Sequence, residues 1–553
     1  MQREEFDYVI VGAGSAGCVL ANRLTEDGRS SVLLLEFGGS DRSIFIQMPT
    51  ALSIPMNTEK YAWRYHSEPE PHLGGRRIYT PRGKVLGGSS SINGMVYIRG
   101  NPGDFDGWQR QGAAGWDYQH VLPYFRRAEH RQEGGDRYRG DSGPLGTCYG
   151  SLRNPLHQAW LAAAREAGYP ATSDVNGFQQ EGFGRMDMTV QNGRRCSAAN
   201  AYLRPAMKRA NLAVRTHAHV TRIAFDGRRA SGVHYRRAER EMLAVARREL
   251  ILSAGSINSP QLLKVSGVGP ADELKALGIP VLHALPGVGE NLQDHLEFYF
   301  QVACREPITL FSVMNPWSKG LIGARWLLRH DGLGASNHFE SCGFIRSRAG
   351  IPYPDIQYHF LPMAVNYDGS NQATQHGFQA HVGPMRSKSR GTVRLQSADI
   401  REPPRIRFNY MSHPDDWVEV RACVRLTREI FAQPAFDRFR GQEMNPGASV
   451  QTDEQIDAFI AEKIETAYHP SCSCRMGAAS DPSAVVDSEG RVIGLEALRV
   501  VDSSIMPTIT NGNLNAPTIM IAEKLADAIR GKTPLPAADV PVYSAPNWQS
   551  AQR

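Results

Sequence analysis

The 553-residue chain lacks several features that would assign it to a broad class of proteins. It has no run of about 18 apolar residues, so no membrane-spanning helix is predicted. Its N-terminus enters an apolar strand without the segments of a signal peptide, so we expect a cytoplasmic protein. The charge is nearly balanced, with 62 basic and 56 acidic residues, and the basic ones are scattered. Nucleic-acid binding is therefore not expected, while a weak attraction to anionic lipid leaves a peripheral position on the inner membrane open.

The eight cysteines lack the clustering of a disulfide framework. They are spread along the chain, mostly in apolar surroundings, as in a reduced intracellular protein. Cys472 and Cys474 have one residue between them, whereas paired zinc ligands usually have two to four. No second pair of ligands is apparent, so we predict no metal site.

A glycine motif lies between two apolar segments near the start of the chain. Residues 8–11 are β-branched or aromatic, as expected for a parallel strand buried on both faces. Three glycines then follow in the pattern G-x-G-x-x-G: Gly12, Gly14 and Gly17. They favour a tight turn, close approach of a pyrophosphate, and close packing of a helix predicted over residues 15–24. A second strand at 32–35 ends at Glu36, where a carboxylate can bind a ribose hydroxyl, and the whole order predicts a dinucleotide-binding Rossmann unit.

A second loop of small residues lies within residues 81–100. Such a loop can bring backbone amides against a flat or anionic ligand. It is framed by Arg82 and Lys84 on one side and a strand-like segment, residues 95–98, on the other. The aromatic segment 61–65 suits either a pocket wall or ordinary core packing.

These motifs resemble those of the glucose–methanol–choline oxidoreductases, which are FAD-dependent enzymes that oxidise alcohols. Further stretches agree in family order: residues 252–263, 468–470, 474–477, 500–507 and 515–520. Three more resemble the choline-oxidising members of the family: residues 291–297, 360–369 and 408–413. The resemblance covers nearly the whole chain and implies FAD as cofactor. It also implies non-covalent binding, because Ile92 stands where some relatives attach the flavin through a histidine.

The resemblance implies a mixed fold, α/β in one domain and α+β in the other. A Rossmann-type FAD-binding domain would take residues 1–150, 195–300 and 465–535, and an antiparallel-sheet substrate domain would take residues 151–194 and 301–464. Within the substrate domain, segments 391–395 and 405–408 alternate like strands, and 415–432 and 453–466 are predicted to be helices. The Pro-rich tail, residues 536–553, is expected to be poorly ordered.

The resemblance also implies which residues form the site. Those expected to bind FAD are Gly12, Gly14, Ser15, Ala16, Gly17, Glu36, Arg82, Gly87, Gly88, Asn93, Gly94, Val220, Ala254, Gly255, Asp502, Pro517 and Thr518. Those expected to contact substrate are Glu297, Tyr468, Trp63 and His359.

His469 is the expected catalytic base, because a histidine with near-neutral pKa can take the hydroxyl proton of an alcohol. Asn515 is expected opposite it, where an amide can hydrogen-bond the substrate oxygen without titrating. A quaternary ammonium has no hydrogen to donate and is held by aromatic faces and a carboxylate. Glu297 stands where choline-oxidising relatives carry that carboxylate. The alternatives are a structural histidine and a solvated acid at a strand end.

The leading hypothesis is FAD-dependent oxidation of choline to betaine aldehyde, with onward oxidation to glycine betaine left open. The hydride would pass to flavin N5 and the electrons to a respiratory or other non-oxygen acceptor, such as a membrane quinone. A dehydrogenase of other primary alcohols, aliphatic or aromatic, is the first alternative. A non-catalytic flavin-binding module is the second, and the intact His469 and Asn515 argue against it.

Overall fold

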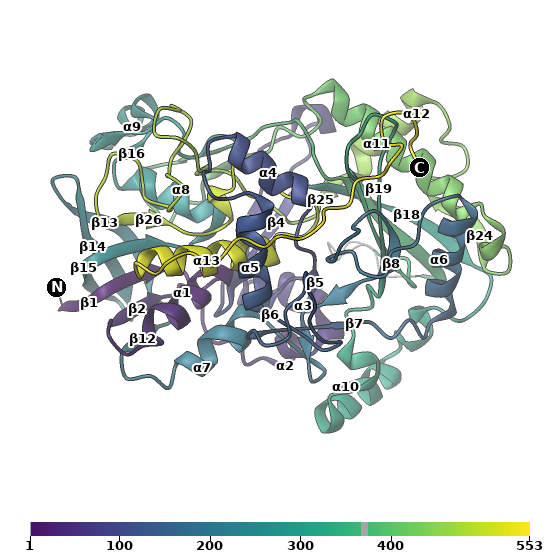
Figure 1. Ribbon diagram of the computed structural model, residues 1–553, viewed down its shortest axis with the longest axis horizontal. Helices are drawn as coiled ribbons and strands as arrows, with labels where there is room; N and C mark the ends of the chain where they lie inside the picture. Colours follow the sequence, from purple (N-terminus) through teal and green to yellow (C-terminus); the bar gives the residue numbers. More distant parts are fainter. Residues whose placement is uncertain (1, 366–373) are drawn as a thin grey trace.

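The computed structural model describes residues 2–365 and 374–553 of the chain. Figure 1 shows two lobes side by side, each built around its own sheet. The predicted combination of an α/β and an α+β architecture is confirmed. Residues 366–369, which belong to one of the stretches that resemble choline-oxidising enzymes, lie outside the described residues.

The first sheet has seven strands in the order β12–β2–β1–β15–β14–β13, with β26 also paired to β15. Its strands are β1 (Gln2–Val11), β2 (Val32–Leu35), β12 (Leu212–Arg215), β13 (His219–Asp226), β14 (Arg229–Arg237), β15 (Arg240–Leu252) and β26 (Leu498–Val500). The strands β12, β2, β1, β15 and β26 run parallel, and the last four residues of β1 are buried as predicted. Strand β1 starts earlier than predicted because its first residues pair with residues 242–246 of β15.

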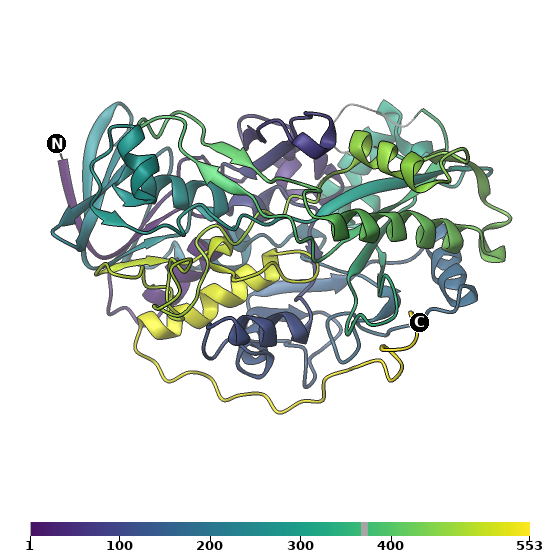
Figure 2. The same cartoon turned by 90° about the horizontal axis from the view of Figure 1, so that it is seen from above.

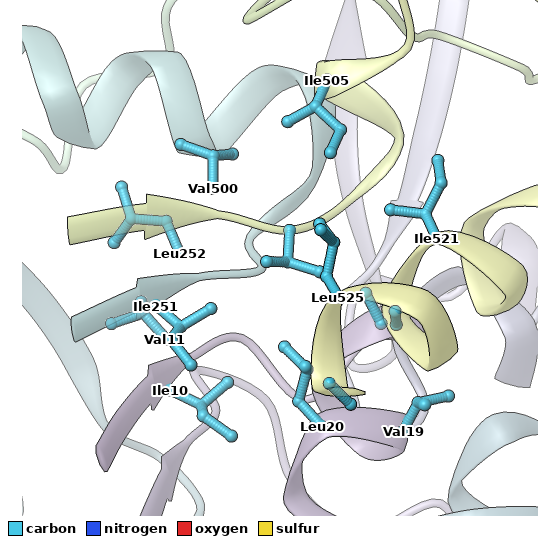
Figure 3. Packing of buried hydrophobic residues seen from close by; sticks show 14 of the residues in the cluster. Ile10, Val11, Val19, Leu20, Ile251, Leu252, Val500, Ile505, Ile521 and Leu525 are labelled. Carbon is cyan, nitrogen blue, oxygen red and sulfur yellow. The ribbon is translucent and has the colours of Figure 1, made fainter. Parts of the chain in front are cut away.

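Helices from both ends of the chain pack together on this sheet. Helix α1 (Ser15–Thr25) lies against α13 (Asn515–Ile529), which α5 (Tyr118–Ala128) covers in turn. Figure 3 shows side chains of α1 and α13, such as Leu20 and Leu525, meeting those of β1, β15 and β26. A Cβ at Gly17 would lie 1.9 Å from the carbonyl oxygen of Gly12. Glycine is therefore required for this close approach of α1 to the turn after β1.

The second sheet is antiparallel throughout, in the order β24–β18–β21–β20–β19–β8, with β25 paired to β18. Its strands are β8 (Gly182–Arg185), β18 (Leu296–Cys304), β19 (Ser341–Ile345), β20 (Ile356–Leu361), β21 (Gly377–Pro384), β24 (Arg440–Asn445) and β25 (Glu465–Thr466). Helices α6 (Pro155–Glu166) and α11 (Pro414–Phe431) pack against the sheet, and α12 (Asp453–Lys463) packs against α11. Aromatic residues fill the space between, with Trp160 stacked on Phe360 at 5.2 Å.

Several predicted elements differ in extent from the observed ones. The helix predicted over 453–466 ends at Lys463, and the residues after it turn extended to form β25. The predicted strands at 391–395 and 405–408 are β22 (Thr392–Arg394) and β23 (Arg405–Arg407), which pair with each other and not with the large sheet. Of the strand-like segment 95–98, only β5 (Val96–Tyr97) forms a strand.

The domain boundaries stay a prediction, and two features run across them. Strand β18 continues through the boundary drawn at residue 300. Tyr65, Leu73 and Ile78, from the segment given to the cofactor domain, pack into the hydrophobic core of the second sheet. The β3–β4 hairpin (Ala62–His66 and Tyr79–Gly83) thus connects the two lobes.

The expectation of a poorly ordered tail is wrong. Residues 536–553 contain no helix or strand, yet Figure 2 shows them running along the edge of both lobes. The backbone N–H of Ala538 donates to the Gln119 carbonyl at 2.9 Å, and that of Gly350 donates to the Trp548 carbonyl at 2.7 Å. Arg553 forms an ion pair with Glu429. These partners hold an extended segment that composition alone would leave free.

Candidate active site

A cavity of about 600 Å³ is lined by elements of both lobes. Its wall includes the turn between β1 and α1, the small-residue loop at 88–94, the start of α13, and residues of β18, β20 and β21. Every predicted site residue lines it except Gly17, Gly87 and Pro517, which pack behind the wall. The structure therefore brings the cofactor and substrate predictions together in one space.

The wall near α1 is open where a pyrophosphate would lie. Gly14 caps α1 without a side-chain hydrogen bond, and the first turn carries no acid, so backbone amides and the helix dipole face the cavity. A Cβ at Gly14 would meet only the Ser253 carbonyl, at 3.8 Å, and one at Gly255 would have no atom within 4 Å. These missing side chains leave room for an anionic group, so the residues fit a dinucleotide.

Polar groups hold the loops of this cofactor side. Glu36 accepts hydrogen bonds from the backbone N–H groups of Ala13 at 2.9 Å and Gly38 at 2.8 Å, and burial raises the pKa of its carboxyl to about 7. Asp502 accepts from the N–H of Gly255 at 2.9 Å. Arg82 donates to the carbonyl oxygen of Tyr468 at 3.0 Å, which ties the cofactor loop to the segment that carries His469.

The backbone at His469 is clamped by a buried carboxylate. Asp294 accepts from the His469 backbone N–H at 2.8 Å through one oxygen, and from the Tyr410 hydroxyl at 2.6 Å through the other. Burial raises the pKa of Asp294 to about 6. Tyr468, the residue before His469, has a φ of 65°, a strained value for a residue with a side chain. The clamp therefore stabilises a bend that turns the imidazole into the cavity.

The neighbours of His469 determine which of its nitrogens carries the proton. The Met385 carbonyl, 3.1 Å from Nε2 of His295, can only accept, so neutral His295 is protonated at Nε2. Nδ1 of His295 must then accept from Nδ1 of His469, 3.1 Å away. Burial lowers the pKa of His295 to about 3, which keeps it neutral. His469 is thus protonated at Nδ1, and its Nε2 presents a lone pair to the cavity.

The amide beside this lone pair is Asn513, and the predicted place of Asn515 is wrong. Nδ2 of Asn513 donates to this unprotonated Nε2 of His469 at 3.1 Å. Asn515 is the first residue of α13, and its Oδ1 accepts from the Ser15 hydroxyl at 2.7 Å. The irregular turn before α13 places the earlier asparagine opposite His469, a detail that the motif spacing did not resolve.

A second chain of hydrogen bonds orients Glu297. The backbone N–H of Val365 donates to Oε1 of Gln379 at 2.8 Å, so the Gln379 amide nitrogen must be the group that faces His381 Nε2 at 2.7 Å. His381 therefore keeps its proton on Nδ1, which lies 3.3 Å from Oε1 of Glu297. The chain holds a buried carboxylate at the cavity wall with one oxygen engaged by a histidine.

The other predicted substrate residues divide between the two ends of the cavity. His359 lies at the His469 end, with Nε2 3.3 Å from Oδ1 of Asn513, and burial lowers its pKa to about 4. Trp63 lies at the Glu36 end, where its ring is 4.5 Å from that of Phe37 and stacks on Tyr65. The ring of Trp63 thus contacts Phe37 on the cofactor side and Tyr65, which belongs to the core of the second sheet.

Comparison with known proteins gives the family of this chain. The sequence pattern described as GMC oxidoreductase matches residues 6–297 and 387–522. The chain belongs to the GMC oxidoreductases. Two members named oxygen-dependent choline dehydrogenase, from Photobacterium profundum and Vibrio vulnificus, are each 58% identical to it. The matches cover 99% of this chain and 97% of the first relative, and 100% of this chain and 99% of the second.

Solved structures of this GMC fold agree with the arrangement of the lobes. Pyridoxine 4-oxidase from Mesorbium loti is 30% identical with a TM-score of 0.85, over 95% of this chain and 99% of that one. An FAD-dependent oxidoreductase from Chaetomium thermophilum is 28% identical with a TM-score of 0.87, over the same shares, 95% and 99%.

Three residues of this GMC site were not singled out from the sequence: His295, His381 and Asn513. His381 lies directly across the antiparallel pair from His359. His359 in β20 and His381 in β21 each end a Gln-x-His pattern within an otherwise apolar, buried strand. Polar residues at matched positions of two buried strands are the signal that could have identified them. Within the described ranges, no three His, Cys, Asp or Glu side chains are grouped to hold a metal ion.

Proposed function

We propose that this GMC oxidoreductase binds FAD without a covalent link and oxidises choline to betaine aldehyde. The observation that carries the proposal is the pairing, in one cavity, of an unprotonated His469 Nε2 with a buried and oriented Glu297 carboxylate. The first group suits the hydroxyl of the substrate and the second its cationic end. The 58% identical relatives named choline dehydrogenase support the same substrate.

The cofactor side supports FAD binding through backbone and glycine geometry. The α1 amides would face the pyrophosphate, Glu36 the ribose, and the 88–94 loop the flavin end. Ile92 is buried against Ile46, Ala62 and Val85 and carries no atom that could bond the ring covalently. Acid precipitation should therefore release all of the flavin into the supernatant, and colour kept in the pellet would contradict the non-covalent link.

When bound, FAD supplies an acceptor for the hydride from the alcohol carbon. His469 takes the hydroxyl proton at Nε2, because its Nδ1 proton is engaged by His295. Burial, with smaller effects from His295, His359 and Arg82, holds the pKa of His469 well below its ordinary value. The imidazole is therefore a neutral base across the physiological range. The Asn513 amide donates one hydrogen to Nε2 of His469 and can donate the other to the developing alkoxide, and Glu297 holds the trimethylammonium group.

The electron acceptor and the membrane are separate parts of the proposal. The relatives' name includes oxygen dependence, whereas the family resemblance alone favoured a non-oxygen acceptor such as a membrane quinone, and no sequence motif decides between them. Choline oxidation measured side by side with an artificial acceptor and with oxygen decides between them. We also propose a peripheral association with the inner membrane, in line with the small excess of basic residues. In the described part of the chain, no helix is long and apolar enough to cross a bilayer.

The substrate is tested by Glu297→Gln, which keeps size and removes the charge. A carboxylate near a cation in a partly desolvated pocket should contribute about 1–3 kcal/mol, or about 5- to 150-fold in kcat/KM for choline. The uncharged analogue 3,3-dimethylbutan-1-ol never gains from the charge, so its kcat/KM should change little. Equal losses for both compounds would make Glu297 structural and favour an uncharged primary alcohol as substrate.

A further inference from the structure

Helix α10 (Pro316–Arg329) projects from the substrate lobe at the lower edge of Figure 1. It carries the two most exposed large hydrophobic side chains of the described residues, Leu328 at 84% and Trp317 at 79% exposed. Leu321 and Leu327 on the same helix are also exposed. Single exposed hydrophobic residues are ordinary, but four on one projecting helix mark an interaction surface.

The inner face of α10 already anchors the helix, so its outer residues are not needed for packing. Trp326 is buried on that inner face and donates its indole N–H to the Gly193 carbonyl at 2.7 Å. At 3.6 residues per turn, Trp317, Leu321 and Leu328 lie within about 40° of one another, on the opposite side of the helix from Trp326. The outer stripe therefore faces away from the protein.

The turns that neighbour α10 expose further apolar side chains. The 3₁₀ turn η6 (Gly332–Ala335), which packs on α10, exposes Leu333. It also packs on η1 (Pro49–Ala51), next to the exposed Ile54. In that same segment, Leu52 and Met56 line the catalytic cavity. Helix α10 is thus connected through η6 and η1 to a segment that lines the cavity.

Basic side chains accompany this apolar face. Lys319, Arg325 and Arg329 lie on α10, and residues 315–330 contain no acid. Asp331, just beyond the helix, pairs with Arg325 at 2.6 Å and lies 3.9 Å from Arg329. At 3.6 residues per turn, Arg325 and Arg329 lie beside the apolar stripe, whereas Lys319 lies on the Trp326 side. Two cations against one acid leave a small excess of positive charge beside exposed tryptophan and leucine. This combination is typical of helices that lie in the interface of an anionic membrane.

We propose that the outer face of α10, defined by Trp317, Leu321 and Leu328 with Arg325 and Arg329 beside them, attaches the protein to bilayers that contain anionic lipid. The proposal deepens the peripheral association inferred above and rests on it. A second copy of the chain is a poorer partner, because a two-fold contact would bring the same basic side chains against each other.

Flotation of the purified holoenzyme with lipid vesicles tests the proposal. The protein should float with phosphatidylcholine vesicles that contain about a quarter phosphatidylglycerol, less with phosphatidylcholine alone, and less at high salt. The double change Leu321→Glu and Leu328→Glu should reduce the bound fraction about tenfold or more. Arg325→Gln with Arg329→Gln should remove most of the salt dependence.

Val418→Glu is the matched control, because Val418 is 49% exposed on α11. An equal loss in this variant, or no flotation of the unaltered protein, would overturn the assignment of α10. A dimer that forms without lipid, and that dissociates when Leu321 and Leu328 are changed, would also overturn the assignment. Choline turnover with a soluble acceptor should stay unchanged in the α10 variants. If the unaltered protein does not turn over choline, the proposed reaction is contradicted, whereas the vesicle result is unaffected.

Discussion

The two ends of the cavity are built in different ways. The cofactor end uses backbone amides and the absence of side chains, with Gly12, Gly14 and Gly17 at the turn between β1 and α1 and in the first turn of α1. The substrate end uses buried titratable side chains brought together from distant segments, such as His295 and His469, which are 174 positions apart. The turn between β1 and α1 at the first end is a matter of shape and follows from local sequence. The second depends on where protons reside, which only the assembled neighbours determine.

The largest expected effect is at the substrate end. His469→Ala removes the nitrogen that presents a lone pair beside Asn513, and general bases contribute about 10²- to 10⁴-fold. We expect turnover with choline to fall by that factor in steady-state assays. Flavin absorbance per protein should be unchanged, because the cofactor end does not depend on this side chain. Near-normal turnover in the variant would exclude His469 as the base.

The cofactor end is probed by two glycines with opposite surroundings. At Gly17, a Cβ would meet the Gly12 carbonyl oxygen at 1.9 Å, whereas at Gly14 the nearest atom is 3.8 Å away. Gly17→Ala should therefore destabilise the fold by about 1–3 kcal/mol and release flavin. Gly14→Ala should keep the melting temperature of the flavin-free protein and weaken only flavin binding. Equal effects of both changes on melting temperature would show that Gly14 also has a packing role.

The fold was predictable where short-range patterns determine it. The apolar run at 8–11, the glycines and the second run at 32–35 led to β1, α1 and β2 with small errors. The tail at 536–553 was predicted wrongly because its order comes from partners such as Gln119, far away in the chain. The helix predicted to 466 failed for a similar reason, since β25 forms only because β18 lies beside it.

The site was predictable as a set of positions but not as a hydrogen-bond network. His469 and Glu297 line the cavity as expected. Their orienting partners are His295, just before β18, and His381, in β21, and the pairing of these strands is not visible in the sequence. The exchange of Asn515 for Asn513 has the same origin, because two residues of irregular backbone decide which amide turns inward.

His381 offers a smaller test of the same contrast. Its Nδ1–H orients the Glu297 carboxylate without touching substrate in our proposal. His381→Leu should raise the KM for choline about fivefold, the scale of one lost hydrogen bond, with little change in kcat. His381→Asn, which keeps a donor near the Nδ1 position, should restore most of the loss. If 3,3-dimethylbutan-1-ol suffers as much as choline, the role of His381 is packing and not orientation of charge.

The smallest expected effect is at Trp63, which marks the dividing line between the two ends. The sequence placed it in the substrate cage, but its ring stacks on Tyr65 and contacts Phe37, the residue after Glu36. Trp63→Phe keeps an aromatic face there, so flavin retention should weaken only slightly. The ratio of kcat/KM for choline to that for 3,3-dimethylbutan-1-ol should change by less than about twofold, because cation–π contacts with substrate would be worth more. A selective loss for choline as large as that of Glu297→Gln would mean that Trp63 reaches the ammonium group. Trp63 would then belong to the substrate end of the cavity and not to the cofactor end.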